Sequence, residues 1–147
     1  MERNPIFIHV YCIEDDDETR LLLREILRTY LLVGLPFQIR HWQEDKEIVQ
    51  GALRYGKMIA QSDTETVIEG TVTQEMIKEV FDNNKRDKEW GKFFTISVGK
   101  IWCTHYGSEL CFSDLSEEEA SAIEKMLSPV ESHLNIYRED FECVIQY

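Results

Sequence analysis

Five consecutive acidic residues, Glu14 to Glu18, are the group whose types and spacing most directly suggest chemistry. An apolar segment, Ile6–Ile13, precedes them and predicts a strand, and a helical pattern begins near Thr19. Carboxylates at such a junction can hold Mg²⁺ through one or two direct ligands, and Asp15 and Asp16 are the candidates. The alternative is a solvated helix start, because negative charge is stabilised at the positive end of a helix dipole. We favour the helix start, so neither a metal nor a cofactor is predicted.

A second possible metal site would use sulfur and nitrogen ligands. Cys103 and His105 share one face of a predicted strand, and both side-chain types bind zinc. Cys111 falls on the other face if Gly107-Ser108 is a two-residue turn, and it joins them only if the turn has three residues. The shorter turn excludes the site, and the chain lacks a Cys-x-x-Cys pair. Zinc binding is therefore not predicted.

Signatures of nucleophilic catalysis are also missing from the sequence. It contains no Gly-x-Ser-x-Gly elbow, no phosphate-binding loop and no His-Glu-x-x-His helix. Cys12 and His9 are separated by an odd number of positions, so an extended strand directs them to opposite faces. No catalytic residue is predicted, and a non-catalytic protein is favoured over an enzyme with an unrecognised site.

The charge of the chain points to a class of partner. The net charge is −12, and ten acids against two bases lie between Ile101 and Tyr147. Such a field repels nucleic acid phosphates and anionic lipids, and it attracts basic protein surfaces. Aromatic side chains among the carboxylates add possible anchors, because Trp and Tyr are enriched in binding hot spots. The residues predicted to contact a basic partner are Trp102, Glu109, Asp114, Glu117 and Glu118.

The cysteine content and the hydropathy pattern favour a cytoplasmic protein. Four cysteines in 147 residues do not suggest a disulfide framework, and three of them lie in strand-like apolar segments. Acids arrive too early for a secretory signal. The longest apolar stretch, Tyr30 to Phe37, is too short to cross a bilayer. No membrane interaction is predicted.

The elements that would position these residues belong to one α/β or α+β domain covering residues 1–147. Alternation of apolar strands and helical patterns predicts a β-α-β-α-β-α first half, with right-handed crossovers if its strands are parallel. Its second helical pattern runs from Asp45 to Ala60. The predicted strands of this half are Ile6–Ile13, Phe37–Trp42 and Thr64–Val72.

The second half predicts a β-meander, one or two helices and a final strand. Tight turns at Gly99-Lys100 and Gly107-Ser108 separate three short strand patterns. Ser116 and Glu119 form a capping box at the start of a helix. The predicted strands here are Phe93–Val98, Ile101–His105, Glu109–Phe112 and the final Phe141–Gln146.

Two family-level comparisons follow from these patterns. The acids after the first strand, with Arg20 leading into a leucine-rich helix, resemble the opening of a response-regulator receiver domain. That resemblance implies a signalling domain that uses Asp15 and Asp16, but Asp63 and Lys100 depart from the receiver pattern.

In overall style the chain is similar to the immunity proteins that neutralise bacterial toxins, which are small, acidic and free of catalytic motifs. The favoured hypothesis is an inhibitor of this type, which covers a basic surface of a toxin or another partner protein. The receiver-like domain and an enzyme with an unrecognised site are the alternatives.

Overall fold

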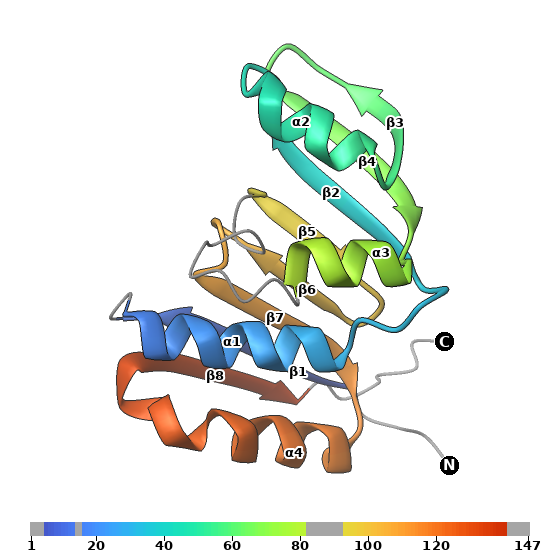
Figure 1. The fold of residues 1–147 in the computed structure, drawn as a ribbon. Coiled ribbons are helices and arrows are strands. Elements are labelled where there is room, and N and C mark those ends of the chain that lie inside the picture. The colour runs from blue at the N-terminus through green and yellow to red at the C-terminus, as the bar shows by residue number, and fades with distance from the viewer. Residues whose placement is uncertain (1–4, 14–15, 82–92, 141–147) are drawn as a thin grey trace, which may run out of the picture.

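All the strands described belong to a single antiparallel sheet, shown in Figure 1. The computed structural model describes residues 5–13, 16–81 and 93–140. The strand order is β3-β4-β2-β5-β6-β7-β1-β8, and every neighbouring pair is antiparallel. The strands are β1 (Ile6–Cys12), β2 (Pro36–Trp42), β3 (Gly56–Gln61), β4 (Glu65–Thr71), β5 (Thr95–Val98), β6 (Ile101–Thr104), β7 (Glu109–Leu115) and β8 (Leu134–Asp140).

The helices of the described ranges pack on one face of this sheet, and none of them lies on the other, which we call the uncovered face (Figure 1). They are α1 (Asp17–Thr29), α2 (Lys46–Leu53), α3 (Gln74–Met76), which continues into a π-helical turn (Ile77–Phe81), and α4 (Glu117–Leu127), which continues into a 3₁₀ segment (Ser128–His133). Strand alternation decides which side chains face the helices. In β1, for example, Ile6, Ile8 and Val10 are buried in the core. The intervening side chains therefore point to the uncovered face.

The fold is α+β, but the β-α-β-α-β-α order predicted for the first half is not confirmed, because the additional strand β3 lies between α2 and β4. β1 and β2 run in the same direction, yet the meander β5-β6-β7 lies between them, so they do not pair. The second predicted helix is also too long. It ends at Leu53, and Gly56–Gln61 form β3, which pairs with β4 as a hairpin. Glycine is required at position 56 of this hairpin, because a Cβ there would collide with the Glu69 carbonyl group on the partner strand.

The capping box predicted at the start of α4 is confirmed, and a second side-chain cap begins α3. Ser116 accepts a hydrogen bond from the Glu119 amide at 3.1 Å, and the Glu119 carboxylate accepts one from the Ser116 amide at 3.0 Å. Thr73 caps α3 by accepting a hydrogen bond from the Met76 amide. The final strand predicted at 141–146 lies outside the described residues. β8, which the sequence reading missed, is the strand that precedes it.

Candidate functional site

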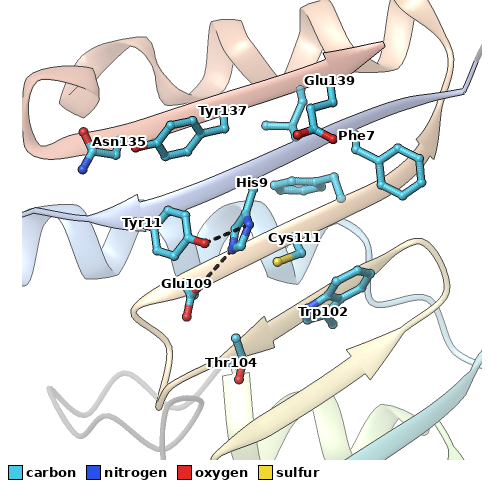
Figure 2. A pocket seen from close by; sticks show the side chains of 12 residues that line it. Phe7, His9, Tyr11, Trp102, Thr104, Glu109, Cys111, Asn135, Tyr137 and Glu139 are labelled. Atoms are coloured by element: carbon cyan, nitrogen blue, oxygen red, sulfur yellow. Dashed lines mark hydrogen bonds and ion pairs between the residues drawn. The ribbon is translucent and has the colours of Figure 1, made fainter. Parts of the chain in front are cut away.

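A hollow of about 740 Å³ lies on the uncovered sheet face, over β1, β6, β7 and β8. Figure 2 shows side chains from these four strands pointing into it. Strand register builds the hollow, because His9 lies opposite Tyr137 and Cys111, and Cys111 lies opposite Trp102. The side chains that line it are Phe7, His9, Tyr11, Trp102, Thr104, Glu109, Cys111, Asn135, Tyr137 and Glu139.

Aromatic rings supply most of the apolar surface of the hollow. Trp102, on the inner strand β6, is 37% exposed, and Tyr137, on the edge strand β8, is 57% exposed. The Tyr11 ring meets the Tyr137 ring edge-on at a centroid distance of 5.9 Å, and it stacks on the His9 imidazole at 4.0 Å. Between these rings and Trp102 lies the small side chain of Cys111, which leaves room at the floor of the hollow.

A chain of polar contacts crosses one end of the hollow. The His9 Nε2 nitrogen donates to Glu109 Oε1 at 2.8 Å, and the Tyr11 hydroxyl lies 3.1 Å from His9 Nδ1 (Figure 2). The other carboxylate oxygen of Glu109 accepts a hydrogen bond from His105. Glu109 is only 7% exposed, so these partners compensate for the burial of its charge. Burial, followed by the charge of Glu109, raises the pKa of Tyr11.

The loop between β6 and β7 positions His105 in this series of polar contacts. It spans residues 105–108, because Thr104 pairs with Glu109, so it is longer than either turn considered from the sequence. His105 and Tyr106 take left-handed φ angles of 53° and 58°, which bend the chain so that His105 faces Glu109. The Ser108 hydroxyl donates to the His105 carbonyl at 2.9 Å and fixes the bend.

The side chains that line the hollow give it a negative electrostatic character. Among the described residues that line it there are two carboxylates, Glu109 and Glu139, and neither lysine nor arginine. Glu139 is exposed, whereas the carboxylate of Glu109 is occupied by two imidazoles. The aromatic rings add to the negative character, because their faces carry partial negative charge. The arrangement favours a positively charged ligand.

The five residues predicted to contact a partner do not lie together. Trp102 and Glu109 line the hollow. Asp114 is exposed near the end of β7, where a bulge against β1 gives it a φ angle of 51°. Glu117 and Glu118 are exposed in the first turn of α4, on the helix-covered side of the sheet. The structure therefore brings two of the five into one site.

Arg138 engages several of the C-terminal acids on the helix side. It donates to Glu117 at 2.6 Å, to Glu124 at 2.9 Å and to Asp140 at 3.0 Å. These hydrogen bonds, the one to Asp140 foremost, raise the pKa of the Arg138 guanidinium. Part of the negative charge counted in the sequence is therefore compensated within the chain.

The candidate metal ligands have structural partners. Asp16 caps α1 by accepting a hydrogen bond from the Thr19 amide at 2.7 Å, and it also lies 2.9 Å from His133. The Thr19 amide is the main cause of the lowered pKa of Asp16. Asp15 lies outside the described residues. Within the described ranges, no group of three or more His, Cys, Asp or Glu side chains is arranged to hold a metal ion.

The two cysteines of the predicted meander lie on opposite faces of the sheet. Cys103 points into the core, whereas Cys111 lines the hollow. Burial raises the pKa of both thiols to about 12, so they stay protonated at neutral pH. The zinc arrangement that needed a three-residue turn does not form.

Trp102 and Glu109 are the lining residues that belong to the five predicted contacts; the other side chains named above, Phe7, His9, Tyr11, Thr104, Cys111, Asn135, Tyr137 and Glu139, do not. Nearly all residues of the segment Ile6–Ile13 are apolar, which makes its two faces hard to tell apart in the sequence. Its alternation of aliphatic residues with Phe7, His9 and Tyr11 was the available signal.

Comparison with known proteins adds no family to this description. Among the described residues, no helix combines the length and the apolar character needed to span a membrane. The chain matches no protein-family model, and no curated protein matches it.

Proposed function

We propose that this protein is a non-catalytic binding module that captures a basic partner protein on the uncovered face of its sheet. The proposed partner is a toxin or another basic protein, which this protein would inhibit in the manner of an immunity protein. The observation that carries the proposal is the hollow itself, in which exposed aromatic rings stand beside carboxylates without a described lysine or arginine.

Physical chemistry connects this surface with such a partner. Trp102 and Tyr137 keep large apolar surfaces in water, and their burial by a partner would contribute to affinity. The net charge of −12 would speed the encounter with a basic protein. It would also oppose the approach of nucleic acid, and of a second copy of this acidic chain.

A reducing compartment is the proposed place of action. Cys103 and Cys111 are free thiols, and the sheet holds them on opposite faces. Free thiols persist in the cytoplasm, where glutathione and thioredoxin keep cysteines reduced. This supports the proposal of a cytoplasmic protein.

Affinity capture with matched variants tests the proposed function. The immobilised protein is exposed to a lysate of the source cells, and retained proteins are identified by mass spectrometry. The test variant combines Trp102→Ala with Glu139→Gln in the hollow. The control variant combines Leu32→Ala with Glu118→Gln, which removes one apolar side chain and one acid at exposed positions away from the hollow.

The expected result is one strongly basic protein that wild type and control retain and that the test variant loses. Retention should also fall as the salt concentration rises, because screening weakens the attraction. The proposal fails if the test variant retains the partner as well as wild type does, or if the only retained partner is acidic.

A further inference from the structure

We infer that the hollow binds an arginine side chain of the partner, with its guanidinium against an aromatic ring and within reach of Glu139. This inference rests on the proposed function and deepens it, because it assigns the partner residue that the hollow accepts.

The width of the hollow suits a side chain that projects from a partner loop. Tyr137, His9, Cys111 and Trp102 form one row across four neighbouring strands. Adjacent strands are separated by about 4.8 Å, so the outer members of this row stand about 14 Å apart along the sheet. Cys111 is the smallest member and makes the low point beside Trp102 (Figure 2). A long, thin side chain fits between such walls, whereas a flat, featureless surface does not.

The negative charge that would attract the guanidinium comes from Glu139, in a second row of side chains. Glu139 lies opposite Phe7, and it stands two positions from Tyr137 on the same face of β8. Its carboxylate is thus flanked by two rings at the rim of the hollow (Figure 2). A cation placed there gains from the carboxylate and from the ring faces together.

Arginine meets these conditions better than lysine. Its guanidinium is planar, stacks on aromatic faces and donates two parallel hydrogen bonds to a carboxylate. It is also less strongly hydrated than the ammonium of lysine, so it loses less when it leaves water for an apolar wall. Another copy of this chain is a poor occupant, because each copy carries a charge of −12.

Peptide titrations followed by NMR test the inference on the full chain. The probes are three peptides, acetyl-Gly-Ser-X-Ser-Gly-amide, in which X is arginine, lysine or citrulline. Citrulline keeps the length and planarity of arginine but carries no charge. The indole signal of Trp102, assigned with Trp102→Phe, reports on the hollow.

The arginine peptide should shift the Trp102 signal saturably and bind about fivefold to tenfold more tightly than the lysine peptide. The citrulline peptide should leave the signal unchanged. Glu139→Gln should weaken arginine binding about threefold to tenfold, whereas Glu118→Gln should leave it unchanged, because Glu118 lies on the helix side. The unchanged spectrum of core residues confirms that each variant is folded.

Three outcomes overturn the inference: equal binding of the arginine and lysine peptides, equal binding of the arginine and citrulline peptides, or no shift of Trp102 with any of them. None of these refutes the proposed function if a basic protein is still captured by wild type and lost by the Trp102→Ala, Glu139→Gln variant. Failure of that capture refutes the proposed function instead.

Discussion

Replacement of Glu109 tests the most heavily constrained part of the site. Its two carboxylate oxygens accept hydrogen bonds from two different imidazoles, those of His9 and His105. Glutamine has a single acceptor oxygen, so Glu109→Gln must present an amide N–H group to one of the rings. Leucine has no polar atom and leaves both rings without this partner. The two variants therefore remove different fractions of the same interaction.

The size of each effect follows from the partners of His9. In the neutral ring, Nε2 carries the hydrogen because it faces a carboxylate, and Nδ1 accepts from the Tyr11 hydroxyl. The hydroxyl can equally accept, so His9 can exchange tautomers and receive a hydrogen bond from the glutamine amide. Two charge-assisted bonds then become neutral ones, which lowers the free energy of unfolding by about 1 to 2 kcal/mol.

The Glu109→Leu substitution removes both hydrogen bonds, the one with His9 and the one with His105. The His105 side chain is 59% exposed and can turn to water, whereas the His9 side chain is 36% exposed and stacked against Tyr11. We therefore expect Glu109→Leu to lower the free energy of unfolding by about 3 kcal/mol, most of it from His9.

Urea unfolding at near-neutral pH measures both variants, and the ¹⁵N shifts of the His9 ring report its tautomer. The expected pattern is a larger loss for leucine than for glutamine, with the His9 hydrogen on Nδ1 in the glutamine variant. Equal losses in the two variants, or a glutamine variant in which Nε2 keeps the hydrogen, would refute the reasoning.

Three further predictions concern the scaffold. Ser116→Ala should lower the free energy of unfolding by about 1 kcal/mol in urea, because it removes the cap of α4, whereas Ser116→Thr should retain most of it. The pKa of Asp16 in the folded protein lies below its ordinary value of 3.8, so the ionised carboxylate contributes fully to the free energy of unfolding above pH 3.8, and this contribution is lost as the pH falls through the pKa of the folded state. When wild type and Asp16→Ala are unfolded at decreasing pH, their free energies of unfolding should therefore converge. Iodoacetamide should alkylate Cys103 and Cys111 at least about a hundredfold more slowly in the folded protein than in urea, as peptide mass spectrometry can measure; fast labelling of Cys111 would contradict its raised pKa.

Short-range signals in the sequence predicted local structure well. The capping box at Ser116 and the cap at Thr73 depend on side chains within three residues of one another, so the sequence alone contains the whole interaction. The alternation of strand and helix patterns left the α/β and α+β classes open, and the structure shows α+β. Strand order did not follow, because the pairing of β1 with β7 and β8 joins residues that are 98 or more positions apart.

The candidate site was predictable only in part for the same reason. The sequence predicts Trp102 as a contact residue for its aromatic character and Glu109 for its charge, and both line the hollow. Their common location depends on the four-residue loop 105–108, whereas the sequence suggested a tight turn at Gly107-Ser108. The β8 residues Tyr137 and Glu139 were not assigned to a strand at all. A count of acids along the chain could not show that Glu117 lies on the helix side, paired with Arg138.

The position of β1 between β7 and β8 has a consequence for biosynthesis. β1 acquires both of its neighbours only after the chain has been made through residue 140. Until then it can pair with β7 alone and its other edge stays open, which is a situation that exposes nascent chains to aggregation. A chain that stopped before Leu134 would lack one wall of the hollow and one edge of the sheet. Until β8 has been made, the hollow therefore lacks Tyr137 and Glu139.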